Sequence, residues 1–374
     1  MKIFTITMAP ISPPYNDGAK NIVMGIAQRI KKHLFYFVSS LGNKFAPETN
    51  IAFIPSLFQK PGRHSMSILQ KLYVLFITVL IAKKIDVFQF FITPQPYFSG
   101  FYSRFVKKNG KKSVQILTSI HTLFNKNANV PISSLFFADR VVVHSDYAKE
   151  KLTALGVKNV IRVYPGVETQ RFGAPRGSDL KHAPLPRVIY PGTYKILNDS
   201  YSFSELLKIA LLVTKKIRNA EFVMACRVRT KEDAKLKKEF AVLLKNNGVE
   251  NFTLLDTVED MPALFNSCAA GIMPVRRPMV GILEIPLVLL ELAVLGKPVI
   301  YGNIAPLDEL ERHGIGIKIS GDGADAYAEN LIRCLKDAKF YSDVANKSQD
   351  GVKRCFTMDA MAAEYDKIYS EIGG

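Results

Sequence analysis

Residues 283–300 have the sequence LEIPLVLLELAVLGKPVI. A helix tolerates proline in its first turn and often ends just before a glycine in the left-handed conformation. Pro286 and Gly296 therefore delimit a predicted helix, and residues 298–300 are predicted to form the strand that follows. Glu291 has four apolar residues on each side. Because an ionised carboxylate rarely stays in such surroundings without a partner, Glu291 either binds a ligand or lies on the one polar stripe of a core helix.

The same segment resembles the donor-site helix of the retaining glycosyltransferases of family 4, which have the GT-B fold. In that family the N-terminus of this helix faces a nucleotide diphosphate, and a glutamate at the position of Glu291 receives the ribose hydroxyls. The resemblance implies that Glu291, Ile285 and Leu287 bind the donor. The chemistry agrees, because unpaired N–H groups and the positive end of a helix dipole attract phosphate, and a carboxylate can accept hydrogen bonds from two vicinal hydroxyls.

The family usually has another glutamate eight positions before the one at Glu291. In this sequence Leu283 occupies that position, and Glu284 follows one residue later. Because a loop can absorb a shift of one residue, the resemblance makes Glu284 the candidate for a contact with the sugar and for a catalytic role.

A second catalytic candidate is His121. Residues 114–120 form a predicted strand that places His121 at its carboxyl end, where open α/β sheets bind their ligands. A lone histidine is more often structural than catalytic, but this one resembles the family's strand-ending histidine beside the donor sugar. Residues 138–145 and 161–172 also resemble signatures of the family, so the likeness extends over essentially the whole chain.

Near the N-terminus, a predicted strand at residues 2–8 is followed by a loop and by a predicted helix at residues 19–32. The family has a Gly-Gly pair in this loop, where the backbone approaches the donor phosphate or the acceptor. Here the pair is Asp17-Gly18. The resemblance therefore makes Gly18 a donor-binding candidate.

The cations that would hold the diphosphate depart from the family pattern. The family's arginine position is occupied by Thr193, and Lys195 is the nearest cation. The other candidates are Arg227, after a predicted strand, and Arg276 and Arg277, in the loop before the donor helix, because a guanidinium group forks onto phosphate oxygens. Thr193 itself remains a donor-binding candidate by position.

At 374 residues the chain exceeds what one core usually serves, so two domains are expected. The predicted fold class is α/β, in the GT-B arrangement of two Rossmann-like domains facing across a cleft. Residues 1–175 form the predicted acceptor-side domain, with a C-terminal helix at 355–374 that crosses back onto it. Residues 183–354 form the predicted nucleotide-sugar-binding domain.

Charge is divided unevenly along the chain. Residues 1–173 contain 23 Lys and Arg against 7 Asp and Glu, which is +16 of the total net charge of +17. Such asymmetry indicates an anionic partner, whereas a plain solubility charge is the alternative. We favour an anionic membrane surface over nucleic acid, because no zinc-finger spacing, aromatic RNA-binding signature or long basic tail appears.

Two segments of this basic half are candidates for membrane contact. The uncharged residues 72–82 are much shorter than the ~20 residues of a membrane span, so we predict a buried helix, with a helix lying on the membrane as the alternative. Residues 97–106 are rich in aromatic side chains and are followed by lysines. They form either an interfacial anchor or a core helix with a solvated basic end.

The resemblance implies transfer of a sugar from a UDP- or GDP-sugar to an acceptor hydroxyl with retention of configuration, through a front-face displacement assisted by the departing phosphate. The acceptor is expected to be a glycan precursor or a lipid-linked one, and no metal or further cofactor is expected. Four cysteines without CxxC spacing indicate a reducing compartment, so we expect a cytoplasmic, peripheral membrane protein. A nucleotide-sugar epimerase of the same fold and a non-catalytic nucleotide-sugar-binding protein remain alternatives.

Overall fold

The computed structural model describes residues 1–7, 11, 18–40, 49–56, 67–172, 186–321 and 323–373, which divide into two compact units. Unit 1 comprises Met1–Gly166, Gly281–Glu284 and Met358–Gly374, and unit 2 comprises Val167–Val280 and Ile285–Thr357. The chain therefore leaves unit 2 for only four residues at Gly281–Glu284. Gly281 has φ of +88°, a conformation that glycine adopts without a steric penalty.

The described strands of unit 1 form one parallel sheet in the order β3-β2-β1-β4-β5-β6-β7. Its strands are β1 (Lys2–Thr7), β2 (Leu34–Ser40), β3 (Ile51–Ser56), β4 (Val87–Phe91), β5 (Lys112–Leu117), β6 (Arg140–Val143) and β7 (Val160–Arg162). Every residue of the central strand β4, with sequence VFQFF, is buried. Such a strand is typical of a parallel sheet covered on both faces.

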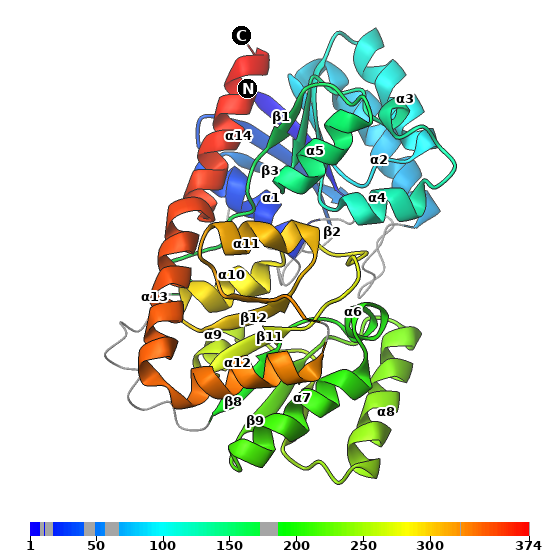
Figure 1. The fold of residues 1–374 in the computed structure, drawn as a ribbon. Helices are drawn as coiled ribbons and strands as arrows, with labels where there is room; N and C mark the ends of the chain where they lie inside the picture. Colours follow the sequence, from blue (N-terminus) through cyan, green and yellow to red (C-terminus); the bar gives the residue numbers. More distant parts are fainter. Residues whose placement is uncertain are drawn as a thin grey trace. The chain divides into compact units, whose positions relative to one another are not determined.

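The helices of unit 1 provide that cover. They are α1 (Gly18–Arg29), α2 (Ile68–Ile81), α3 (Pro96–Lys108), α4 (Ile120–Lys126), α5 (Asp146–Ala154) and α14 (Met358–Gly373), with short 3-10 turns at Ala82–Lys84 and Ile132–Leu135. α1 and α14 lie side by side (Figure 1). Tyr369 of α14 donates a hydrogen bond to Gln89 of β4, whereas α2 and α3 pack on the alternate residues Phe88 and Phe90. The two helix pairs therefore cover opposite faces of the sheet.

Unit 2 contains a second parallel sheet, in the order β10-β9-β8-β11-β12-β13. Its strands are β8 (Arg187–Tyr190), β9 (Glu221–Ala225), β10 (Phe252–Leu255), β11 (Ala270–Met273), β12 (Val299–Gly302) and β13 (Ile317–Ile319). Its helices are α6 (Tyr194–Ser200), α7 (Phe203–Lys216), α8 (Lys231–Asn246), α9 (Met261–Asn266), α10 (Leu287–Val294), α11 (Asp308–Arg312), α12 (Ala324–Lys336) and α13 (Ala338–Cys355), with a 3-10 turn at Ala305–Leu307.

Two sequence predictions about unit 2 are confirmed. Gly296 follows the end of α10 with φ of +69°, the left-handed conformation predicted for it. The cysteines are free thiols, and Cys226, Cys268 and Cys334 are buried.

Two local predictions about unit 1 were wrong. β5 ends at Leu117, and α4 begins at Ile120, so His121 lies in the first turn of a helix and not directly after a strand. The reason is a helix cap, because the Ser119 hydroxyl accepts a hydrogen bond from the amide of Thr122. The segment predicted to be a buried helix forms α2, whose inner face is buried but whose outer apolar face is exposed.

Candidate functional site

The predicted donor-binding loops of unit 2 follow parallel strands. Thr193 comes after β8, Arg227 comes after β9, and Arg276 and Arg277 come after β11. Parallel neighbouring strands end at the same edge of a sheet, which is where open α/β sheets bind ligands. The fold of unit 2 therefore brings these loops to a common edge.

The N-terminus of α10 is open. Pro286 occupies the N-cap position and makes no side-chain cap, and the amides of Leu287 and Val288 lie in the first turn, where a helix offers no internal acceptor. The side chains of Ile285 and Leu287 are buried. Any contact of these two residues with a ligand would therefore be made by the backbone.

Glu291 lies at the middle of α10 and is half-buried. Burial raises the pKa of its carboxyl group to about 7, and the nearby Arg171 lowers that pKa only in part. A carboxyl group with a pKa near neutral pH is partly ionised although it is buried. A ligand that donates hydroxyl hydrogen bonds would stabilise this ionised form. Glu291 is thus better placed for binding than a carboxylate on a solvated stripe.

Thr193 and Lys195 have structural partners already. The Thr193 hydroxyl caps α6 by accepting a hydrogen bond from the amide of Ile196 at 3.1 Å. The Lys195 ammonium is exposed and pairs with Glu232 at 2.8 Å and Asp199 at 3.3 Å. Hydrogen bonds to these two carboxylates raise the pKa of Lys195, and its ammonium group is already engaged by the protein.

The three arginines differ in how they are held. Arg276 stacks on the ring of Tyr201, with 4.5 Å from guanidinium carbon to ring centroid, and pairs with Glu205 at 3.1 Å. Arg227 is half-buried and also engaged by neighbours. Arg277 is exposed, and within the described ranges no hydrogen bond or ion pair holds its side chain. Arg277 therefore has the cationic group most available to an anionic ligand.

Glu284 is 3% exposed and belongs to unit 1. One carboxylate oxygen accepts a hydrogen bond from the amide of Ile120 at 2.7 Å, and the other accepts from the Ser145 hydroxyl. These donors lie at the N-termini of α4 and α5, where a negative charge is favoured by the helix dipoles. Both oxygens have protein partners, which favours a structural role over the predicted contact with the sugar.

His121 lies in the first turn of α4, next to Ile120, whose amide donates a hydrogen bond to Glu284. The amide of Gly281 donates to the Thr122 hydroxyl at 2.8 Å, and the amide of Glu284 donates to the carbonyl of Thr118 at 3.2 Å. The His121 ring lies 5.6 Å from that of Tyr147, and burial lowers its pKa. Its buried Nε2 has no hydrogen-bond partner within the described residues. A buried nitrogen without a partner is costly, so a hydrogen bond from a ligand hydroxyl would be favourable there.

Gly18 is the first residue of α1 and lies after β1, at the same edge of the unit 1 sheet as the β5–α4 connection. Asp17 and the loop residues 12–16 lie outside the described residues. The role predicted for Gly18 stays a prediction.

Sequence comparison assigns the second half of the chain. Residues 186–337 match the family of glycosyl transferases group 1, which agrees with the resemblance seen in residues 283–300. The chain carries a group 1 glycosyltransferase domain. No curated protein matches the chain in sequence.

Solved structures show the same fold as this glycosyltransferase. HepE of Anabaena, solved with UDP-glucose, is 15% identical with a TM-score of 0.74, and the match covers 99% of this chain and 100% of HepE. Sucrose-phosphate synthase of Thermosynechococcus elongatus is 14% identical with a TM-score of 0.75 over 99% and 98% of the two chains. A glycosyltransferase of Rickettsia africae is 15% identical with a TM-score of 0.73 over 99% and 98%. The predicted GT-B fold is confirmed.

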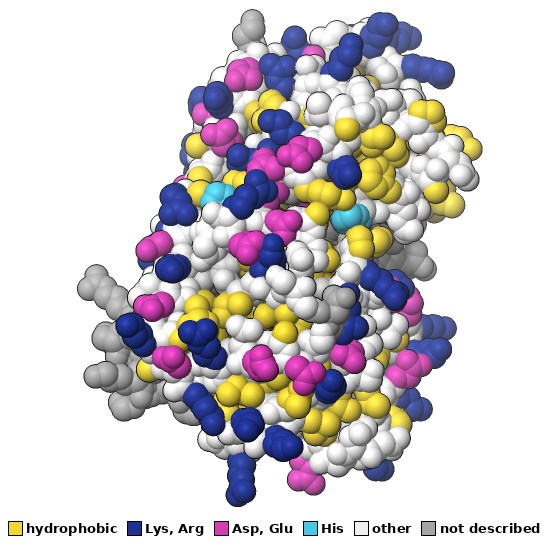
Figure 2. All heavy atoms as spheres, in the orientation of Figure 1, with side chains coloured by type: hydrophobic (Ala, Val, Ile, Leu, Met, Phe, Trp, Pro, Cys, Tyr) yellow, Lys and Arg dark blue, Asp and Glu magenta, His cyan; other side chains and the backbone are white. Residues whose placement is uncertain are grey.

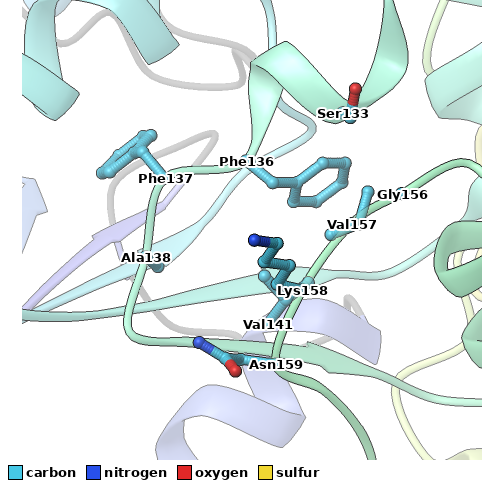
Figure 3. A pocket seen from close by; sticks show the side chains of 9 residues that line it. All are labelled: Ser133, Phe136, Phe137, Ala138, Val141, Gly156, Val157, Lys158 and Asn159. Carbon is cyan, nitrogen blue, oxygen red and sulfur yellow. The ribbon is translucent and has the colours of Figure 1, made fainter.

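A cavity of about 220 Å³ lies in unit 1, and none of the predicted site residues line it (Figure 3). Phe136 and Ala138, which line it, precede β6, and Lys158 and Asn159 precede β7. The cavity therefore lies at the amino end of these strands, opposite the edge where β5 leads into α4. It is not part of the candidate site.

Sequence reasoning missed the partners of Glu284. Ser145 is the N-cap of α5, and its hydroxyl accepts a hydrogen bond from the amide of Ala148 at 3.0 Å. No pattern in the sequence links Ser145 or Ile120 to a glutamate 139 or 164 residues away. The only local signal is the serine before each helix, which predicts a cap but not its second partner.

Proposed function

We propose that this glycosyltransferase transfers a sugar from a UDP- or GDP-sugar to an acceptor hydroxyl with retention of configuration and without a metal. The observation that carries the proposal is on α10, which combines an uncapped N-terminus with a half-buried Glu291 whose pKa is about 7. Phosphate oxygens would meet the amides of the first turn, and the ribose hydroxyls would donate to Glu291. Arg277 would add a cation at the diphosphate.

UDP-glucose is the donor to test first, because HepE, which has the same fold, was solved with it. Thermal unfolding of the protein should be measured with UDP-glucose, GDP-mannose and ADP-glucose, since a ligand that binds the folded state raises the midpoint. A donor that stabilises the protein should then be incubated with and without acceptor extract. Formation of an epimer from donor alone, or binding with no transfer to any acceptor, would contradict the proposal.

His121 is proposed to support the chemical step. His121→Ala should lower kcat about tenfold, the scale of one hydrogen bond that strengthens in the transition state, while the Kd for donor stays within about twofold. Steady-state kinetics and calorimetric titration measure the two quantities, and thermal unfolding checks that the variant is folded. An unchanged kcat would make His121 a structural residue.

Donor affinity should depend on pH through Glu291. A carboxyl group with a pKa of about 7 loses its proton as the pH rises through 7, and the ionised form is the better acceptor for ribose hydroxyls. The Kd for UDP-glucose should therefore be about tenfold weaker at pH 6 than at pH 8. The diphosphate diester does not titrate in this range, and Glu291→Gln should remove the dependence. The same pH dependence in that variant would exclude Glu291 as its cause.

The acceptor is proposed to be a lipid-linked glycan precursor at the cytoplasmic face of an anionic membrane. The support is the charge of +16 on residues 1–173 and the exposure of Tyr97 and Phe101 on α3, at 92% and 38%. The proposed cations are Lys107, Lys108, Lys111 and Lys112. Phe105, which the sequence placed in this anchor, packs instead on Phe88 with ring centroids 5.5 Å apart. No helix of the described residues is long and apolar enough to cross a membrane.

A further inference from the structure

α2 exposes a continuous apolar face. Six of its side chains are between 53% and 77% exposed, namely Ile68, Leu69, Leu72, Phe76, Val79 and Leu80. With 3.6 residues per turn these positions fall within an arc of about 120° and extend for about 18 Å along the helix. Soluble proteins rarely leave such a set of large apolar side chains in water unless something covers it.

The opposite side of α2 explains why the face is directed outward. Val74 and Ile77 are buried in the core of unit 1, on the side of the helix away from the exposed residues. Tyr102 of α3 belongs to the same core cluster as these two residues, and Lys71 lies over the ring of Phe98 of α3 at 5.7 Å. The helix is therefore held against α3 and the sheet by one side, and its other apolar side remains outside the core.

The chemistry around this face is cationic. Residues 49–138 contain eleven Lys and Arg and a single acidic residue, Asp86. Lys71 lies on α2, and Lys83 and Lys84 follow it directly and are exposed. Figure 2 shows Lys and Arg side chains at the outer edge of the region where Figure 1 labels α3. An apolar face with cationic neighbours complements a surface that is apolar inside and anionic outside.

We propose that the outer face of α2 inserts into the headgroup and acyl boundary of an anionic phospholipid bilayer, with the helix lying in the membrane plane. The apolar side chains would be buried among the acyl chains, and Lys71, Lys83 and Lys84 would meet phosphate headgroups. The proposal refines the membrane-bound acceptor of the proposed function, because it makes α2 the inserting element and gives the four lysines at and just after the end of α3 a supporting electrostatic role. A protein partner would need an acidic rim to match this charge, so the bilayer is the better occupant.

Fluorescence can test the insertion directly, because the chain contains no tryptophan. Phe76→Trp places a single fluorophore on the outer face of α2, and Val242→Trp places one on α8 in unit 2, where the native side chain is 49% exposed. Vesicles of phosphatidylcholine with phosphatidylglycerol should shift the emission of Phe76→Trp to the blue, and brominated lipid should quench it. Val242→Trp should show neither effect. Equal responses of the two variants, or none, would overturn the proposal.

Co-sedimentation provides the second test. Leu72→Asp combined with Phe76→Asp should lower the partition coefficient onto anionic vesicles at least about tenfold, because charge replaces inserted apolar groups. The matched control is Leu211→Asp with Val242→Asp, which changes side chains that are 43% and 49% exposed on α7 and α8. The control should sediment like the wild type. Vesicle binding should weaken when salt is raised, or when Ser replaces Lys107, Lys108, Lys111 and Lys112. At high lipid concentration the blue shift of the Phe76→Trp emission should remain.

The test separates this inference from the proposed function. Stabilisation by UDP-glucose should be the same in the α2 variant and the wild type, because α2 belongs to unit 1 and the predicted donor-binding loops belong to unit 2. Donor binding without any vesicle binding at low salt would overturn the membrane surface and leave the transferase proposal standing. A wild type that is dimeric in light scattering, and monomeric after the α2 change, would assign the face to a second copy of the chain and also overturn the proposal.

Discussion

Glu284→Ala is expected to lower the free energy of unfolding of unit 1 by about 2 to 4 kcal/mol. The carboxylate is 3% exposed and accepts hydrogen bonds from the Ile120 amide and the Ser145 hydroxyl, so its removal leaves two buried donors without acceptors. It also removes a negative charge from the N-termini of α4 and α5. Denaturant unfolding measures the loss, and hydrogen exchange of α4 and α5 amides locates it.

Further variants separate a structural role from a role in catalysis. Glu284→Gln keeps the shape and one acceptor, so its loss of stability should be smaller than that of Glu284→Ala. Ser145→Ala removes one partner, and a double-mutant cycle with Glu284→Ala should give a coupling of about 1 to 2 kcal/mol. If Glu284→Ala is as stable as the wild type but loses activity, the carboxylate acts on the substrate, as the family resemblance predicts.

Glu291→Gln is expected to weaken donor binding by about 1 to 3 kcal/mol, which corresponds to about 5-fold to about 150-fold in Kd. The carboxylate would accept from two ribose hydroxyls, whereas the amide offers one acceptor and presents two N–H donors. The fold should be retained, because burial already raises the pKa of this group to about 7 and a neutral side chain is tolerated there. Calorimetric titration with UDP and with UDP-glucose measures the effect.

The control for this prediction is Glu329→Gln, which makes the same chemical change at an exposed position of α12. It should leave the Kd unchanged. A Glu291→Gln protein that binds donor as tightly as the wild type would make Glu291 a structural carboxylate on a polar stripe of α10.

The raised pKa of Glu291 also predicts how the stability of the protein depends on pH. The folded-state pKa of Glu291 is raised above its usual value of 4.5, so the folded protein binds this proton more tightly than the unfolded chain does. The favourable contribution of the protonated group is fully present below about pH 4.5 and is lost as the pH rises to about 7. A bound donor that needs the ionised carboxylate should lower the pKa of Glu291. With donor present, the protein should therefore lose less stability as the pH rises.

The fold and the helix α10 could be predicted from sequence because their signals are local. Pro286 before α10, Gly296 after it and the strand at β12 lie within a few residues of one another, and their backbone preferences act over that distance. The excess of Lys and Arg in residues 1–173 could also be found from the sequence, since charge is a property of composition. Arg276 and Glu291 could be named as candidates from their position relative to predicted strands and helices.

The environment of each candidate depended on contacts between distant residues. Lys195 was predicted as a phosphate ligand, but its ion pair with Glu232 forms only when α6 and α8 come together, whereas its pair with Asp199 lies within α6. Glu284 was assigned to the sugar from its spacing to Glu291, yet its carboxylate is held by residues from β5–α4 and β6–α5. Hydrogen-bond partners separated by more than a hundred residues leave no periodic pattern in a single chain.

α2 shows the same limit for hydrophobic residues. Its composition establishes an uncharged helix too short to span a bilayer, and this much follows from residues 72–82 alone. Whether an apolar residue is buried depends on how many faces of the helix are covered, and α3 and the sheet cover one of them. Local propensity and composition therefore establish which segments are helices and strands and where the charge lies, whereas packing between distant segments sets which apolar faces stay in water and which carboxylates remain available to a ligand.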